Sequence, residues 1–323
     1  MRAVWLKEFG PPEALVPGEA PDPVPGAGQV VVAVSFANIT FVETQVRAGR
    51  SPFPLPPGAL PMIPGNGVGG VVAATGPGAD ADAALIGRRV VSATGGRGGY
   101  AERAAVPAGG LVEVPAGLAV DEAVALLADG RTAMALIRAA RIAPGERVLV
   151  LAAAGGVGSL LVQLAQAAGA RVLAAAGGPG KLRLARELGA EVTADYRQPD
   201  WPVALRAAAG GADVVFDGVG GPIGRAAFEL FGPGGRMLSY GLASGEFTEV
   251  GEDEARARRV TIARGVPVTP DESTALTRAA LGLAAAGRLR AVIGQRFPLE
   301  AAAAAHRAIE ARATTGKTLL EVS

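Results

Sequence analysis

The chain contains no cysteine and only one histidine, His306, among its 323 residues. Without cysteine it cannot form a disulfide, an iron–sulfur cluster or a thiolate zinc site. One histidine and no cysteine also leave no ligand set of the usual kind for a catalytic zinc ion. His306 lies in an alanine-rich segment, so we expect it to be a packing residue.

The chain also has almost no net charge, because 31 basic residues face 30 acidic ones. A net charge of +1 gives no field that would favour nucleic acid or an anionic membrane. No apolar signal segment follows Met1, and we expect a cytoplasmic protein. Residues 148–170 are uncharged and long enough to span a bilayer, but Gly155, Gly156 and Gly158 break them in two. A buried strand followed by a helix is therefore the preferred interpretation.

One stretch, residues 146–181, predicts a strand–helix–strand unit. An apolar strand over 148–152 leads into a glycine turn, a helix over 157–168 and a second strand over 171–176. Glycines at such a turn let the backbone approach a pyrophosphate, and the helix N-terminus supplies free N–H groups. The alternative is a tight turn with no ligand. We expect the turn to bind a dinucleotide through Gly155, Gly156, Val157 and Gly158.

The end of the second strand indicates which dinucleotide binds. An NAD site usually has an acid about 20 residues beyond the turn, and none occurs from Ser159 to Arg186. The strand instead ends in small residues that include Gly177, and Lys181 follows. Lys181 alone is more typical of a solvated helix residue, but together with the missing acid the space and the cation suit the 2′-phosphate of NADPH.

The remaining pattern divides the chain into a β-rich part and an alternating part. Short apolar runs over 30–34, 70–74 and 88–91, separated by turns, predict a compact barrel-like domain. Strands and helices alternate over 121–263, for example a helix over 223–231 followed by a strand over 236–240, which predicts a parallel sheet with helices on both faces. The chain is long enough for two such domains.

Three shorter features have plain structural interpretations. Residues 41–48 have helical character, and Glu43 and Arg47 are spaced for a surface ion pair. Residues 52–64 carry six prolines and predict a stiff connecting loop, with a polyproline ligand as the alternative. The glycine-rich residues 95–100 lack the Lys-Ser/Thr of a phosphate loop, and we expect a mobile turn.

Taken together, the motifs resemble the zinc-independent quinone oxidoreductases of the medium-chain dehydrogenase/reductase superfamily. The resemblance covers nearly the whole chain. Where zinc enzymes of that superfamily carry Gly-His-Glu, this chain has Gly65, Asn66 and Gly67. The motifs that carry the resemblance are AAAGGVG at 152–158, DGVG at 217–220, GRMLSYG at 235–241 and EARATTGK at 310–317.

The resemblance implies a fold in two parts. It implies an α/β protein in which a Rossmann doubly wound parallel sheet over 121–263 binds NADPH. A GroES-like β-barrel catalytic domain would combine residues 1–120 with 264–323. A homodimer and an active cleft between the two domains are also implied.

It also implies the residues of the site. Lys181, Tyr196 and Arg312 match positions that surround the 2′-phosphate of NADPH. Further cofactor positions match Gly218, Tyr240, Gly241, Leu242 and Arg264, and the catalytic site would be lined by Thr40, Glu43, Arg47 and Thr132. The family often has Asn, Asp and Tyr where this chain has Thr40, Glu43 and Gln45, and an aromatic residue where it has Ala135. These departures leave the substrate open.

The expected function is hydride transfer from NADPH to a quinone, with no metal. Thr40 or Thr132 would orient the acceptor by a hydrogen bond, and water or a hydroxyl would deliver the proton. One alternative is an enoyl or enone reductase, which also needs a proton at the α-carbon of its substrate. Another is a protein that binds NADPH without catalysis.

Overall fold

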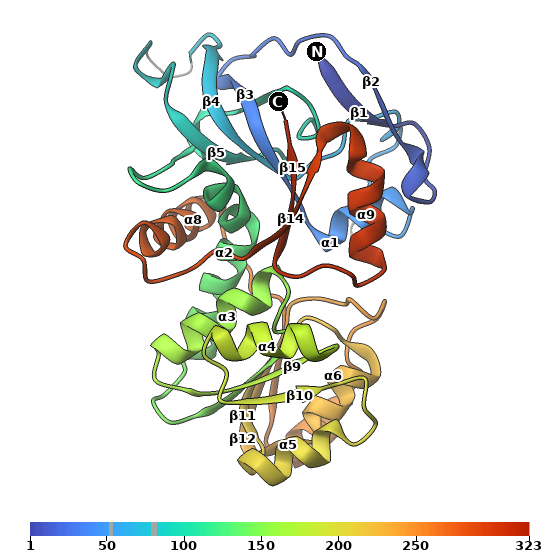
Figure 1. The fold of residues 1–323 in the computed structure, drawn as a ribbon, viewed down its shortest axis with the longest axis vertical. Helices are drawn as coiled ribbons and strands as arrows, with labels where there is room; N and C mark the ends of the chain where they lie inside the picture. The colour runs from blue at the N-terminus through green and yellow to red at the C-terminus, as the bar shows by residue number, and fades with distance from the viewer. Residues whose placement is uncertain (52–53, 79–82, 323) are drawn as a thin grey trace. The chain divides into compact units, whose positions relative to one another are not determined.

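The structure is a computed structural model that describes residues 1–51, 54–78 and 83–322 (Figure 1). The chain divides into two compact units. One combines Met1–Arg131 with Pro270–Ser323, and the other is Thr132–Thr269.

The unit Thr132–Thr269 is built on one parallel sheet with the order β10-β9-β8-β11-β12-β13. Counted from β8 this is the 3-2-1-4-5-6 order of a doubly wound fold, so the expected Rossmann sheet is confirmed. Its strands are β8 (Arg147–Leu151), β9 (Arg171–Ala176), β10 (Val192–Asp195), β11 (Ala212–Asp217), β12 (Phe231–Ser239) and β13 (Thr261–Arg264). Its helices are α3 (Gly156–Ala167), α4 (Pro179–Glu187), α5 (Trp201–Ala209), α6 (Gly221–Phe228) and α7 (Glu252–Ala257).

The apolar strands form the core of this sheet. Leu149, Leu151, Leu173 and Val215 are completely buried and belong to one cluster. Strands covered on both faces read as continuous apolar runs, which explains why residues 148–152 carry no charge. No helix in the described ranges is long and apolar enough to cross a membrane.

One helix ends earlier than the sequence indicated. A helix was expected over 223–231, but α6 ends at Phe228 and Phe231 begins β12. The rings of Phe228 and Phe231 meet edge to face at 6.0 Å. A Cβ atom on Gly235 would lie 2.2 Å from the Phe231 ring, so glycine allows the ring to cover the strand. Phe231 therefore belongs to the start of β12, and the glycines that follow it interrupt the strand pattern in the sequence.

The other unit contains a seven-stranded sheet and a separate β1–β2 hairpin among its described residues. The sheet runs β14-β15-β3-β4-β5-β7, with β6 paired to β3, and leaves β14 and β7 at its two ends. The strands are β1 (Arg2–Leu6), β2 (Leu15–Glu19), β3 (Gln29–Ile39), β4 (Gly67–Thr75), β5 (Arg89–Ala93), β6 (Arg103–Pro107), β7 (Val112–Glu113), β14 (Ile293–Pro298) and β15 (Lys317–Glu321). The helices are α1 (Phe41–Arg47), α2 (Val120–Ala140, which continues into the other unit), α8 (Pro270–Ala285) and α9 (Ala302–Glu310).

Two further features of this unit are its proline-rich segment and the long helix α2. Residues 54–64 form no helix or named strand, as expected for a connecting loop, while Pro52 lies outside the described residues. Helix α2 runs without a break through Gly130. A Cβ atom there would lie 2.9 Å from the Cβ of Ala280 in α8, so glycine permits the close approach of the two helices.

Candidate functional site

The turn between β8 and α3 is closely packed. Gly155 is the N-cap of α3, and Ala152 at the end of β8 has a left-handed backbone with φ of 50°. A Cβ atom on Gly158 would lie 2.3 Å from the carbonyl oxygen of Ala152. Glycine at 158 therefore lets the helix begin directly against the strand.

The first turn of α3 is suited to an anion. No side chain caps this helix, and its first turn contains no acidic residue. The N–H groups of a first turn have no partner within the helix, and they carry a partial positive charge. All four residues expected to bind the pyrophosphate lie in this turn: Gly155, Gly156, Val157 and Gly158.

The end of β9 brings together further candidate residues. A Cβ atom on Gly177 would lie 3.3 Å from the Tyr196 ring, and one on Gly178 would lie 3.0 Å from Nη2 of Arg197. Lys181 lies in the first turn of α4, which follows directly. The predicted residues Gly177, Lys181 and Tyr196 therefore lie around one strand end.

The sequence reasoning missed an acid at this position. Asp195 ends β10, where it pairs in register with Ala176 of β9, and its Oδ2 accepts a hydrogen bond from the Gly178 N–H (3.1 Å). Residues 159–186 contain no acid, but β10, the strand next to β9 in the sheet, supplies Asp195. The Arg197 guanidinium beside Asp195 lowers the pKa of that carboxyl to about 2.

The ends of β11 and β12 form the next part of the site. A Cβ atom on Gly218 would lie 2.6 Å from the Tyr240 hydroxyl, and one on Gly241 would lie 2.8 Å from the Gly218 carbonyl oxygen. Leu242 follows and is half-buried. The small residues let the two loops lie against each other.

A buried acid that the sequence analysis did not single out holds these loops. Asp217 is fully buried, and its Oδ1 accepts hydrogen bonds from the N–H groups of Val219 (2.9 Å) and Gly220 (2.8 Å). Its Oδ2 accepts bonds from the hydroxyls of Thr248 (2.7 Å) and Ser239 (3.3 Å). Several donors around one carboxylate satisfy its charge, which gives Asp217 a positioning role.

Arg264 lies at the end of β13. Its guanidinium donates to the carbonyl oxygen of Thr248 (3.4 Å) and lies over the Phe247 ring at 5.9 Å. The structure therefore ties it to the loop that Asp217 also holds.

In the other unit, Thr40 and Glu43 form a closed hydrogen-bonded pair at the start of α1. The N–H (2.6 Å) and the hydroxyl (2.9 Å) of Thr40 both donate to Oε2 of Glu43. This is a capping box, in which the third residue of a helix satisfies the backbone of the cap. Glu43 is buried, and burial raises its pKa.

The expected surface ion pair between Glu43 and Arg47 is wrong. Both side chains are buried, and Arg47 donates instead to the carbonyl oxygen of Gly10 and to the carboxylate of Glu310. Glu43 accepts the hydrogen bonds of Thr40 in the capping box, so its carboxylate does not form a surface pair with Arg47. Arg47 therefore joins α1 to α9, away from Thr40.

Arg312 and Thr132 lie apart from these groups along the chain. Arg312 has φ of 56°, and its guanidinium lies over the Phe41 ring at 4.5 Å. Thr132 is half-buried in α2 and belongs to the unit that contains the parallel sheet.

His306 lies buried in α9, as expected for a packing residue. Its Nε2 is 3.0 Å from the hydroxyl of Tyr100, which is also fully buried. Burial lowers the pKa of His306 to about 3. Among the described residues no group of three or more His, Asp or Glu side chains is arranged to hold a metal ion.

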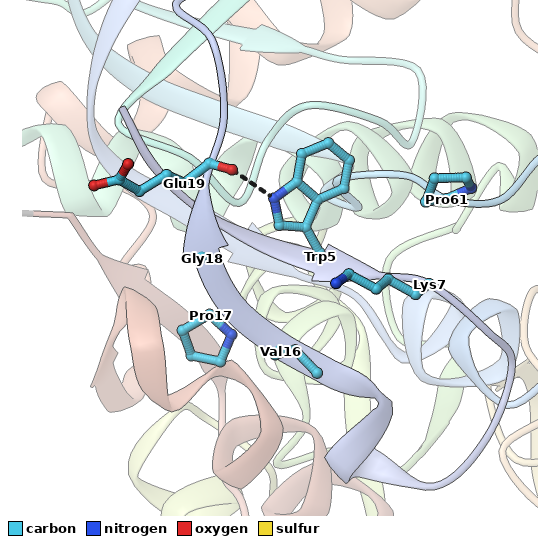
Figure 2. Close-up of a pocket in the computed structure, with 7 residues that line it drawn as sticks. All are labelled: Trp5, Lys7, Val16, Pro17, Gly18, Glu19 and Pro61. Atoms are coloured by element: carbon cyan, nitrogen blue, oxygen red, sulfur yellow. Dashed lines mark hydrogen bonds between the residues drawn. The ribbon is translucent and has the colours of Figure 1, made fainter.

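Figure 2 shows a separate hollow on the β1–β2 hairpin, where the indole N–H of Trp5 donates to the carbonyl oxygen of Glu19 (3.0 Å). Its volume is about 520 Å³. None of the expected site residues lines it. The lining consists of Trp5, Lys7, Val16, Pro17, Gly18, Glu19 and Pro61.

Two family models match the chain. The Alcohol dehydrogenase GroES-like domain matches residues 26–116, and the Zinc-binding dehydrogenase matches residues 188–320. The first match lies within the unit that contains the seven-stranded sheet, and the second begins in the parallel-sheet unit and continues into the C-terminal segment of the other unit.

Full-length relatives are similar over almost their whole length. The Quinone oxidoreductase of Pseudomonas aeruginosa is 33% identical over 99% of both chains. A 2-haloacrylate reductase of a Burkholderia species is 31% identical over 99% of this chain and 98% of its own. The Escherichia coli quinone oxidoreductase, solved in complex with NADPH, is 29% identical with a TM-score of 0.90, and the match covers 99% of this chain and 100% of that one.

Proposed function

The chain belongs to the quinone oxidoreductases of the medium-chain dehydrogenase/reductase superfamily, and we propose that it is an NADPH-dependent reductase whose acceptor is a quinone. The observation that supports NADPH as the cofactor is the arrangement of residues at the end of β9. Two glycines there lie against Tyr196 and Arg197, and Lys181 follows in the first turn of α4. The carboxylate of Asp195 beside them is paired with Arg197. A cationic strand end suits a 2′-phosphate.

The same unit offers sites for the rest of the cofactor. The uncapped first turn of α3 would hold the pyrophosphate through backbone N–H groups. Gly218, Tyr240, Gly241, Leu242 and Arg264 would border the remainder. When bound, NADPH supplies a hydride, and the protein supplies position and electrostatics. Arg312 would add a further cation for the 2′-phosphate.

We propose that the reaction needs no zinc. The chain has no cysteine, and its only histidine is buried against Tyr100. Asn66 and Gly67 stand where zinc enzymes of the superfamily carry His and Glu. A quinone is electron-poor and its reduced anion is stabilised, so a metal Lewis acid is not required.

For the catalytic site we propose Thr40 and Thr132 as groups that orient the acceptor by hydrogen bonds. Glu43 would act through Thr40, because it accepts hydrogen bonds from both the N–H and the hydroxyl of that residue. Arg47 would support α1 from behind through Gly10 and Glu310. Thr40→Ser retains the hydroxyl and should retain turnover, whereas Thr40→Val should lower kcat.

An enone reductase is the second candidate, and the Burkholderia 2-haloacrylate reductase favours it. A haloacrylate is a conjugated acid, and saturating its double bond requires a proton at the α-carbon. The same cofactor site would serve this reaction. The two candidates differ only in the acceptor and in the need for a proton donor.

We further propose that residues 1–120 with 264–323 are the catalytic domain and residues 121–263 the NADPH domain. The GroES-like match at 26–116 and the Rossmann sheet support this division. We also propose a homodimer, which the family resemblance implies, and a cytoplasmic location. Light scattering on the purified chain would give the mass that checks the dimer.

The experiment is a panel of quinones and conjugated enones, assayed with NADPH and with NADH in parallel. We expect NADPH oxidation with quinones and much slower oxidation with NADH. Faster turnover of enones than of quinones would replace the first candidate by the second. Tight NADPH binding with no turnover of any acceptor would contradict both and indicate a non-catalytic NADPH-binding protein.

A further inference from the structure

The carboxylate of Asp195 lies where its negative charge would disfavour binding of the 2′-phosphate of the proposed cofactor. It ends β10 beside the end of β9, and its Oδ2 accepts the Gly178 N–H (3.1 Å). Its side chain is 14% exposed, so water screens it only partly. A carboxylate at a nucleotide-binding strand end can accept a hydrogen bond from a ribose hydroxyl, but it repels a phosphate dianion.

Arg197 neutralises this carboxylate through a two-pronged contact. Its Nε donates to Oδ1 (3.0 Å) and Oδ2 (3.2 Å) of Asp195, and its Nη2 donates to Oδ2 (2.6 Å). The backbone N–H of Arg197 also donates to Oδ1 (3.1 Å). Such bidentate, charge-assisted contacts hold the guanidinium plane in a defined orientation. The side-chain hydrogen bonds to Asp195 use Nε and Nη2, so the N–H groups on Nη1 take no part in this contact.

The guanidinium lies directly against the strand end. A Cβ atom on Gly178 would be 3.0 Å from Nη2 and 3.3 Å from Cζ of Arg197. A Cβ atom on Gly177 would be 3.4 Å from Cδ of Arg197. The two glycines therefore make room for Arg197 itself. The Arg197 side chain is 57% exposed, so a ligand can reach it.

We propose that Arg197 determines cofactor specificity at this site. It cancels the charge of Asp195 and presents its own guanidinium to the 2′-phosphate of NADPH. This inference rests on the proposed function for the identity of the ligand. Without Arg197 the Asp195 carboxylate would face the ligand uncompensated, which favours NADH over NADPH.

The test measures binding rather than turnover. Dissociation constants would be determined by calorimetry for NADPH, NADH and adenosine 2′,5′-bisphosphate, which carries the 2′-phosphate without the nicotinamide. The proteins are the unmodified chain, Arg197→Gln, Asp195→Asn and the double variant. Arg183→Gln is the matched control, because Arg183 is an exposed arginine on α4 paired only loosely with Glu187 (3.9 Å).

We expect Arg197→Gln to weaken NADPH and the bisphosphate by about 10- to 100-fold and NADH by less than about threefold. The double variant should recover part of that loss, because the asparagine introduced by Asp195→Asn carries no charge. Asp195→Asn alone should bind NADPH at least as tightly as the unmodified chain. Arg183→Gln should leave all three constants unchanged.

Two outcomes would overturn the role of Arg197. Equal weakening of NADPH and NADH would show that Arg197 only maintains the fold. An unchanged constant for the bisphosphate would show that it does not sense the 2′-phosphate. Failure of the proposed function is distinguishable, because the unmodified chain would then bind NADPH selectively but reduce no quinone, and the binding constants would still decide the role of Arg197.

Discussion

The carbonyl oxygen of Ala152 lies against the Cα of Gly158, so closely that a Cβ atom at 158 would approach it to 2.3 Å. Strand β8 and helix α3 meet at this contact. The position of the helix N-terminus, and hence of the proposed pyrophosphate site, depends on it.

Gly158→Ala should destabilise the protein by about 1–3 kcal/mol, because the added methyl group meets backbone that cannot move aside freely. NADPH binding should weaken as well. Urea unfolding and a binding titration measure the two effects. Gly282→Ala in α8 is the control, since nothing lies within 4 Å of its Cβ position, and it should stabilise by about 0.5–1 kcal/mol. Loss of stability in both variants would mean that the contact with Ala152 is not the cause.

Ala152→Gly should stabilise the protein by up to about 1 kcal/mol. Ala152 has φ of 50°, a left-handed conformation that is costly for a residue with a Cβ atom. Glycine removes this strain but adds freedom to the unfolded chain, so the gain is modest. Denaturant unfolding checks it. Ala207→Gly in the exposed part of α5 should cost about 1 kcal/mol, and the same sign at both positions would contradict the argument.

Lys181→Ala should weaken NADPH binding by roughly 10- to 150-fold through the loss of a charge-assisted contact with the 2′-phosphate. NADH has no phosphate at this position and should bind almost as before. Fluorescence titration with each cofactor measures the ratio. Arg183→Ala on the same helix is the control. Equal weakening of NADPH and NADH would remove Lys181 from the phosphate site.

His306 should make stability depend on pH. Burial lowers its pKa to about 3, whereas an unfolded histidine titrates near 6.5. Between these values the unfolded state binds a proton that the folded state does not, so stability falls as the pH falls from about 6.5. The slope should be up to about 1.4 kcal/mol per pH unit.

His306→Gln tests this assignment, because the chain has no other histidine. The variant should lose the slope between pH 6.5 and 5 in urea unfolding. Glutamine retains a polar group that can meet the Tyr100 hydroxyl, which limits other damage. A slope that persists in the variant would show that another group titrates.

The parallel sheet could be predicted because its strands are apolar on both faces and its turns carry glycine. Residues 148–152 and 171–176 read as strands for this reason, and they are β8 and β9. Strand β12 was expected to begin at 236, because the glycines at 232, 234 and 235 conceal its start. The cover that Phe231 gives to Gly235 arises only from packing.

Only part of the candidate site could be predicted from the sequence. The glycine turn and Lys181 could be recognised locally, because their spacing along the chain is itself what indicates dinucleotide binding. Asp195 and Asp217 gave no such signal, because part of their surroundings comes from other strands and loops. The Gly178 N–H reaches Asp195, and the hydroxyls of Ser239 and Thr248 reach Asp217, only in the folded chain. An Asp at a strand end is common, and only the hydrogen bonds around it reveal its role.

The sequence by itself determined that thiolate chemistry is absent, and it predicted a dinucleotide-binding turn between β8 and α3, because residue types and local spacing suffice for both. Tertiary structure decided what surrounds the end of β9. The parallel register places Asp195 beside Ala176, and Arg197 covers Gly178 and neutralises that acid. The Asp195 carboxylate meets the Gly178 N–H only after β9 and β10 pair, so no local pattern contained the whole arrangement.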